Sequence, residues 1–325
     1  MKIFKLKYLA FALIILLQWS CQNEEVTKSN SVAIDTQNQF SDKICASQEL
    51  LEQQLKDDPA MATRMNEIEA FTKNYIKNNP NAELLAGNLV IPVQVNVLYN
   101  NSAENVSWNQ IQSQIDVLNK DFKALNTDYN TVPAFFQSKR ANIGITFTLN
   151  PTIQRKLTTN TTWPSGYTMM RTDTGGIATK EPSKNLNIYV CDLTINGLAT
   201  SPGAAGNPLD GVVIDYQQFG TLGSATAGNL GRTGSHEVGH WMGLKHIWGD
   251  ANCGDDSVAD TPVHNSPNYG NPIYPHYSTC AGTPIEMTMN YMDYTGNNRY
   301  MFSLGQKTKI DATFAVGGPR ASFRN

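Results

Sequence analysis

The stretch from His236 to His246 reads H-E-V-G-H-W-M-G-L-K-H and constrains the fold of this chain more than any other segment. Side chains four residues apart lie on one face of a helix, so His236 and His240 are expected to face a common point. Gly243 can adopt the positive-φ conformation that ends a helix, which lets the chain turn back and present His246. Three neutral imidazoles with an open fourth position are the ligands of a catalytic zinc ion, not of a closed structural one.

Glu237 follows the first of these histidines and projects about 100° away from it around the helix, so it is not a ligand of the same ion. It is placed to take a proton from water as a general base and to return that proton to a leaving amine. The chain has 5 histidines in all, and three of them fall in this one stretch. An accidental grouping of surface or core histidines is therefore a poor explanation of the pattern.

A second motif, Asn290-Tyr291-Met292-Asp293-Tyr294, follows further along the chain. The two motifs together resemble the signature of metzincin peptidases, in which a Met-turn follows the histidine motif. This resemblance implies that Met292 packs beneath the three imidazoles, a place that suits an apolar and polarizable thioether. The phenol of Tyr294, two residues later, is expected to reach toward the metal. The alternative for both residues is an ordinary core position.

Taken together, these motifs resemble the pappalysin family of metzincin metallopeptidases, in particular its secreted bacterial members. The resemblance covers roughly residues 88–315, and its most specific segments are 231–262 and 289–303. It implies a zincin fold with an upper subdomain of twisted mixed sheet and long helices, including the zinc helix. It also implies an irregular lower subdomain that holds the Met-turn and a C-terminal helix, with a substrate cleft between the two.

The same resemblance implies a calcium site in the loop after the zinc helix. Its candidate ligands are Asp255, Asp256, Asp260 and Thr261, and oxygen donors of this kind suit calcium. The alternative is ordinary turn formation by Asp and Thr. His264 and His276, in the same loop, are interpreted as surface residues.

Five cysteines are an odd number. If Cys21 is modified, the remaining Cys45, Cys191, Cys253 and Cys280 allow three pairings, and spacing alone does not decide among them. The resemblance implies a disulfide between Cys253 and Cys280. Relatives often carry a further cysteine after the Met-turn, which residues 295–301 lack, so one disulfide fewer is expected here.

The N-terminus has the features of an export signal. Residues 1–20 combine three lysines with a short apolar run and are read as a signal peptide. Cys21 directly follows a small residue and is predicted to be lipidated, with simple signal cleavage as the alternative. Residues 21–44 are polar and are read as a tether. The expected location is the outer membrane, either facing outward or released, with the lipid as the sole membrane contact.

Residues 45–87 are read as a small helical propeptide, with helices over 47–57 and from Asp58-Pro59 to Asn78. Cys45 stands just before these helices. A thiolate is a good zinc ligand, so Cys45 is predicted to occupy the fourth position and keep an enzyme latent. A free thiol and a disulfide with Cys191 are the other possibilities.

Residues 88–325 are assigned to a catalytic domain of α/β or α+β class. Alternating apolar residues indicate strands near 93–99 and 143–149, with further strands over 186–193 and 212–216. A long amphipathic helix is expected after Ser107, which with Gln110 suggests a capping box. An edge strand near 197–201 is expected to bind extended substrate, and a closing helix is expected over 303–313.

The formal net charge of −3 provides no basic field for nucleic acid. The expected partners are therefore protein or peptide substrates, cleaved by a zinc endopeptidase made as a zymogen. Two other functions remain: a catalytically idle surface lipoprotein that keeps the fold, and a zinc hydrolase acting on another bond. The resemblance implies that some relatives cleave before Arg and pair it with an acidic residue just after the Met-turn tyrosine. Residues 295–298 carry no carboxylate, so a strong preference for Arg after the scissile bond is not expected here.

Overall fold

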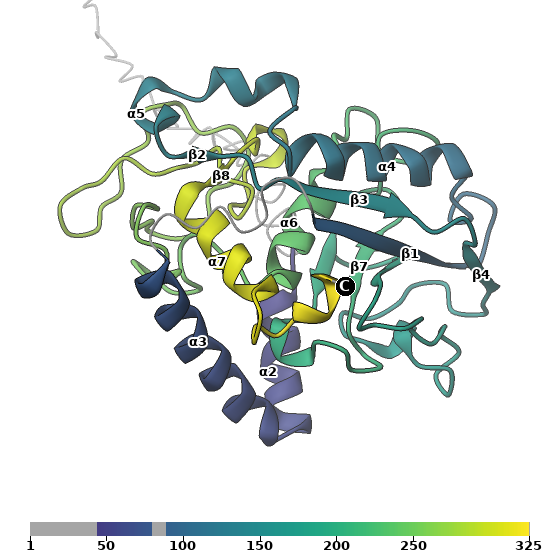
Figure 1. The fold of residues 1–325 in the computed structure, drawn as a ribbon. Coiled ribbons are helices and arrows are strands. Elements are labelled where there is room, and N and C mark those ends of the chain that lie inside the picture. The colour runs from purple at the N-terminus through teal and green to yellow at the C-terminus, as the bar shows by residue number, and fades with distance from the viewer. Residues whose placement is uncertain (1–43, 80–88, 325) are drawn as a thin grey trace, which may run out of the picture.

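A mixed sheet is the scaffold of the molecule, with the strand order β3-β1-β5-β7-β6 and β4 also paired to β1. The computed structural model describes residues 44–79 and 89–324 (Figure 1). The strands of this sheet are β1 (Leu89–Tyr99), β3 (Ile145–Leu149), β4 (Gln154–Leu157), β5 (Leu186–Cys191), β6 (Gly197–Ala199) and β7 (Val212–Asp215). The pairings are parallel except that edge strand β6 runs antiparallel to β7.

Burial explains why the central strands are apolar along their whole length. Parallel strands are covered on both faces, so they read as nearly continuous apolar runs. Strand β5 is buried at every position, and β1 begins at Leu89, earlier than its alternation suggested, with most of its residues buried. The predicted strands are thus confirmed, and β1 is longer at its start than predicted.

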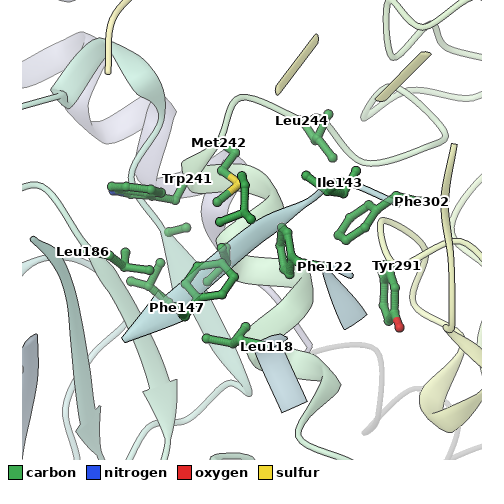
Figure 2. Packing of buried hydrophobic residues seen from close by; sticks show 14 of the residues in the cluster. Leu118, Phe122, Ile143, Phe147, Leu186, Trp241, Met242, Leu244, Tyr291 and Phe302 are labelled. Carbon is green, nitrogen blue, oxygen red and sulfur yellow. The ribbon is translucent and has the colours of Figure 1, made fainter. Parts of the chain in front are cut away.

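Helices α4 (Trp108–Asp121) and α6 (Arg232–Trp241) pack beside the sheet and against each other, and their buried side chains form part of the core. Figure 2 shows Leu118 and Phe122 from the α4 region, together with Phe147 of β3 and Trp241 of α6. The Ser107 hydroxyl accepts a hydrogen bond from the Gln110 backbone at the start of α4. The predicted capping box is only half formed, because the Gln110 side chain donates to the Tyr216 and Phe219 carbonyl oxygens instead. Remaining short elements are η1 (Thr127–Thr131), α5 (Ala134–Gln137), η2 (Thr168–Met170), η3 (Pro202–Ala204), η4 (Gly296–Asn298) and η5 (Ala321–Arg324).

The chain after Gly243 has little regular structure until α7 (Leu304–Phe314). Helix α7 starts with a complete capping box formed by Ser303 and Gln306. Strand β8 (Phe302–Ser303) pairs with β2 (Arg140–Ala141). The ring of Phe302 packs against Phe122 and Tyr291, with ring centroids 4.9 Å and 4.7 Å apart (Figure 2). These contacts join the upper sheet to the irregular lower half.

Two helices precede the sheet, α2 (Ser47–Asp57) and α3 (Ala60–Asn78), within the bounds expected from the sequence. The Asp58 carboxylate accepts a hydrogen bond from the Ala60 backbone at the start of α3. Helix α3 packs against α7 and η3, and α2 lies next to edge strand β6. The helical pair therefore lies across the molecule below α6 and α7 (Figure 1). Among the described residues, no helix combines the length and apolar character needed to cross a membrane.

Candidate metal centre

Three imidazoles converge at the end of helix α6. The Nε2 atom of His240 lies 3.1 Å from the Nε2 atoms of both His236 and His246. The helix supplies the first two, and the turn at Gly243, with φ of 97°, returns the chain so that His246 joins them. The predicted positive φ at Gly243 and the convergence of the three histidines are both found.

Each imidazole is held by a hydrogen bond at its other ring nitrogen. His236 Nδ1 lies 2.6 Å from the Tyr291 carbonyl oxygen, and His240 Nδ1 lies 2.8 Å from that of Leu244. His246 Nδ1 bonds to the Asp250 carboxylate. Such outer partners fix the tautomer, so all three Nε2 lone pairs point to one spot.

The protonation state of these rings suits a metal cation. Burial lowers the pKa of His236 well below its ordinary value and lowers that of His240 to about 3. Neutral imidazole is the form that binds metal, and three nitrogen donors with a thiol nearby match the preferences of zinc. The Cys45 sulfur completes the group, since it and the three histidine nitrogens lie within 4.8 Å of one another.

Glu237 is fully buried beside the imidazoles and bound to the segment that precedes α2. Its Oε2 atom accepts hydrogen bonds from Ser47 Oγ at 3.0 Å and from Cys45 Sγ at 3.4 Å. Its Oε1 atom has no hydrogen-bond partner among the residues that the structure describes. Burial raises the pKa of Glu237 to about 8, while the Ser47 and Cys45 hydrogen bonds lower it. A carboxylate held this way is suited to accept and return a proton.

The segment before α2 extends the sheet at edge strand β6. Cys45 forms a parallel bridge with Gly197, and the Ala46 backbone donates to the Gly197 carbonyl oxygen at 3.1 Å. The Ala199 backbone donates to Ser47 Oγ at 2.8 Å. The edge strand expected to bind extended peptide is therefore paired with residues of the chain itself.

Met292 and Tyr294 both lie close to the histidine cluster. A Cβ atom added to Gly239 would meet Met292 Sδ at 2.5 Å, so the sulfur packs directly against the zinc helix. The Tyr294 ring packs on that of His246, with centroids 4.9 Å apart, and its hydroxyl donates to the Cys45 carbonyl oxygen at 3.4 Å. Met292 therefore contacts the zinc helix, and the Tyr294 hydroxyl contacts the residue whose sulfur joins the metal-binding group.

The four residues proposed for calcium have partners within the protein. Asp256 Oδ1 accepts from the Thr261 hydroxyl at 2.9 Å and from the Val258 backbone at 3.0 Å. Asp255 accepts from the Ser257 backbone. Asp260 is directed elsewhere, because its carboxylate accepts from Ser303 Oγ and the Gly305 backbone at the start of α7. The structure therefore brings Asp256 and Thr261 together but turns Asp260 toward a helix N-terminus.

The interpretation of His264 as a surface residue is wrong. Its side chain is fully buried, and its Nε2 atom accepts from the Met287 backbone at 2.9 Å. Its Nδ1 atom lies 3.6 Å from an Asp293 carboxylate oxygen. Burial lowers its pKa to about 4, which keeps the ring neutral. His276 is half-buried and contacts Glu286.

The disulfide that the resemblance implied is present. Cys253 and Cys280 form a disulfide, whereas Cys45 and Cys191 are free thiols. The alternative disulfide between Cys45 and Cys191 is therefore not formed. Cys21 and the signal segment lie outside the described residues.

Three site residues escaped the analysis of the sequence: Asp250, Ser47 and Arg299. Asp250 follows His246 by four residues, a spacing that could have suggested the contact. Ser47 is separated from Glu237 by 190 positions, and no local pattern reveals such a pair. Arg299 is buried and close enough to Glu237 for the carboxylate charge to influence its pKa.

Fold and site together define a metallopeptidase of the metzincin type, with a zinc helix, a third histidine after a glycine turn and a methionine beneath them. The profile of the M43 peptidase family, described as Pregnancy-associated plasma protein-A, matches residues 177–315. An extracellular metalloprotease of Podospora anserina is 35% identical over 201 residues, covering 58% of this chain and 65% of that protein, just under two thirds of its length. One of Pyricularia oryzae is 34% identical over 225 residues, covering 66% and 70%.

Solved structures agree with these relatives. A point mutant of promirolysin from Tannerella forsythia superposes with a TM-score of 0.76 at 35% identity, covering 87% of this chain and 97% of that one. Mature mirolysin from the same organism, in complex with a cleaved peptide, gives 0.69 at 38% identity, covering 73% and 95%. The chain belongs to the M43, or pappalysin, family of zinc metallopeptidases.

Proposed function

We propose that this chain is an exported endopeptidase that cleaves extracellular proteins and is made as a latent zymogen. The observation that carries the proposal is the geometry around Glu237. One carboxylate oxygen has no partner among the described residues, while three inward-facing imidazole nitrogens lie nearby. A polar atom buried without a partner is costly, and it is expected where a reacting molecule must bind.

His236, His240 and His246 would hold the zinc ion, which when bound supplies a Lewis acid for the scissile carbonyl group. Glu237 accepts a proton from the attacking water through its free oxygen and passes it to the leaving amine. The Tyr294 hydroxyl already donates to the Cys45 carbonyl oxygen, so it is placed to donate to a substrate carbonyl in the same cleft. Edge strand β6 orients the substrate through its backbone groups.

The enzyme is latent because residues 45–47 occupy the positions that a substrate needs. The Cys45 sulfur is the fourth member of the metal-binding group and pairs with β6 through its backbone. The Ser47 hydroxyl also donates a hydrogen bond to the Glu237 carboxylate. We assign residues 45–87 to a propeptide and 88–325 to the catalytic domain, with residues 1–20 as signal peptide and 21–44 as a tether acylated at Cys21. Helices α2 and α3 then hold the blocking segment against the catalytic domain.

The test is cleavage of gelatin, casein and a peptide library by the full chain, before and after limited trypsin treatment. Activity should appear on processing and should disappear with a zinc chelator or in a Glu237→Ala variant. If processed, zinc-loaded protein cleaves nothing, the alternative of an idle surface-binding lipoprotein is favoured.

Calcium binding is a secondary proposal for Asp255, Asp256 and Thr261, without Asp260, whose carboxylate is bound at the start of α7. It is supported by the resemblance and by the paired Asp256 and Thr261 oxygens. The thermal midpoint of the full chain should rise on adding calcium and should rise less in an Asp256→Asn variant. A midpoint that does not respond to calcium rejects this site.

A further inference from the structure

Arg299 differs from the other buried arginines in having no carboxylate partner. Three arginines are buried among the described residues. Arg232 lies 2.6 Å from the Asp128 carboxylate, and Arg320 lies 2.6 Å from that of Asp210. Arg299 is only 6% exposed, yet no carboxylate of the described residues lies within ion-pair distance. A buried charge without a counter-charge is strongly unfavourable, so this guanidinium requires an explanation.

Only some of the N–H groups of the Arg299 guanidinium donate hydrogen bonds. Its Nε atom donates to the Gly296 carbonyl oxygen and its Nη1 atom to that of Asp293, both at 3.2 Å. These bonds brace the turn that follows Met292. Its Nη2 atom makes no hydrogen bond to any residue that the structure describes. A guanidinium presents a planar fork suited to a carboxylate, and here one end of the fork stays free.

The acidic groups near Arg299 are not available to it as structural partners. Asp293 contributes its backbone oxygen, whereas its carboxylate accepts from the backbone of Asn268 and of Tyr294. Residues 295–298 contain no carboxylate. No carboxylate of the described residues therefore pairs directly with Arg299, although the charges on Glu237 and Asp293 act on it without contact, and its Nη2 atom is left available to a carboxylate from another molecule.

The position of Arg299 indicates which part of a substrate it would meet. The Arg299 Nη1 atom donates to the carbonyl oxygen of Asp293, which lies between Met292 and Tyr294, and the Tyr294 ring packs on that of His246 with centroids 4.9 Å apart. The guanidinium therefore lies beside the turn that borders the metal centre. Burial lowers the pKa of Arg299, and negative charge on Glu237, Asp293 and Cys45 acts in the opposite direction. Because Glu237 returns a proton to the leaving amine, the substrate residue that bears this amine lies beside Glu237. This residue, P1′, is the one that directly follows the scissile bond.

We propose that Arg299 is a specificity-determining residue that pairs with a carboxylate on the P1′ residue of the substrate. The inference rests on the proposed endopeptidase function and gives it a substrate class, proteins cleaved before Glu or Asp. This preference agrees with the lack of a carboxylate in residues 295–298, since such a carboxylate would favour Arg at P1′. A free C-terminal carboxylate offers the same chemistry, so the experiment must separate it from an acidic side chain.

The experiment uses fluorogenic peptides that differ only at P1′, which is Glu, Gln or Lys, each with an amidated or a free C-terminus. They are offered to trypsin-processed, zinc-loaded full chain. The ratio of kcat/KM for Glu over Gln should be roughly tenfold or more, since charge-assisted bidentate pairs are strong. Amidated peptides should retain this ratio. A preference seen only with peptides that end at P1′ in a free carboxylate would overturn the side-chain assignment.

Variants at Arg299 distinguish charge recognition from bracing of the turn. Arg299→Gln should reduce the Glu-to-Gln ratio to about one while leaving the Gln peptide hydrolysed, and Arg299→Glu should shift the preference to Lys. Arg299→Lys keeps the charge and should keep the preference even if the Gln variant folds poorly. Arg140→Gln, which removes a half-buried arginine paired with backbone and Tyr129, serves as the charge-matched control and should change no ratio.

The possible failures are separable. If no peptide or protein is cleaved under any condition, the proposed function fails. If peptides are cleaved but wild-type protein treats Glu and Gln alike, only the specificity inference fails. If the Arg299→Gln variant still prefers Glu over Gln at P1′, another residue recognises the acidic side chain.

Discussion

Replacing Ser47 by alanine should release a measurable part of the latent activity. The Ser47 hydroxyl makes two buried contacts in the closed state, accepting from the Ala199 backbone at 2.8 Å and donating to Glu237 Oε2 at 3.0 Å. Ser47→Ala removes both and leaves the Ala199 amide without its partner while the segment stays bound. Helix α2 itself should be little affected, because alanine is a good helix former.

The size of the effect follows from these two contacts. A hydrogen bond to a charged group contributes about 1.5–3 kcal/mol, and an unsatisfied buried amide costs about 1–3 kcal/mol. Because relaxation recovers part of this loss, we expect a net weakening of about 2 kcal/mol, which raises the open fraction about thirtyfold. The activity of unprocessed protein should rise by the same factor until the open state is no longer rare.

The assay measures peptide hydrolysis by unprocessed full chain and divides it by the activity after limited trypsin treatment. Cys45→Ala should open the site further, and the double variant shows whether the two contacts act independently. Gln53→Ala is the control, since this exposed residue of α2 bonds to Asp57 within the same helix. Fully processed samples should have equal activity, because Ser47 then lies in the released segment. If Ser47→Ala stays as latent as wild type while Cys45→Ala is active, the hydroxyl has no part in latency.

Three further predictions concern the metal centre and the helices around it. Asp250→Ala should weaken zinc binding roughly 10–100-fold by freeing His246 Nδ1, as competition with a chromogenic chelator would show, and unchanged affinity would reject the orienting role. Gly239→Ala should destabilise the fold by about 1–3 kcal/mol in denaturant titration, because the added carbon would meet Met292 Sδ, whereas a neutral result would show that the methionine can move. Burial raises the pKa of Asp311 from 3.8 to about 6. Between these two values the folded state keeps a proton that the unfolded chain has lost, so the free energy of unfolding should fall as the pH rises from about 4 to about 6. Asp311→Asn should remove up to about 3 kcal/mol of that pH dependence in urea titrations, and identical slopes for both proteins would place the titration elsewhere.

The sequence predicts those parts of the molecule that depend on local spacing. The zinc helix, the turn at Gly243 and the start of α7 are each encoded within a few neighbouring residues, and all appear in the structure. The strands follow from apolar alternation in the same way. Met292 and the disulfide between Cys253 and Cys280 are more distant features, and they were anticipated through the family resemblance rather than through periodicity.

Features that depend on long-range packing were missed or misread. His264 lies in a loop rich in polar residues and without apolar periodicity, which is typical of an exposed segment. It is buried against Met287, which precedes the Met-turn, and against Asp293, which forms part of that turn. Arg299 is equally ambiguous in sequence, since arginine is usually exposed, and only the structure shows its burial.

The way residues 45–47 bind has a consequence for activation. They occupy the edge strand through backbone pairing, the metal-binding group through a thiol and the general base through a hydroxyl. A peptide substrate needs all three of these positions at once, and the tethered segment has the advantage of high effective concentration. Oxidising or alkylating Cys45 would free one position but leave the strand and Glu237 engaged, so it should activate less than proteolysis. We therefore expect full activity to need cleavage between α3 and β1, so that the segment can dissociate on dilution, and alkylated but uncleaved protein should hydrolyse peptides more slowly than processed protein.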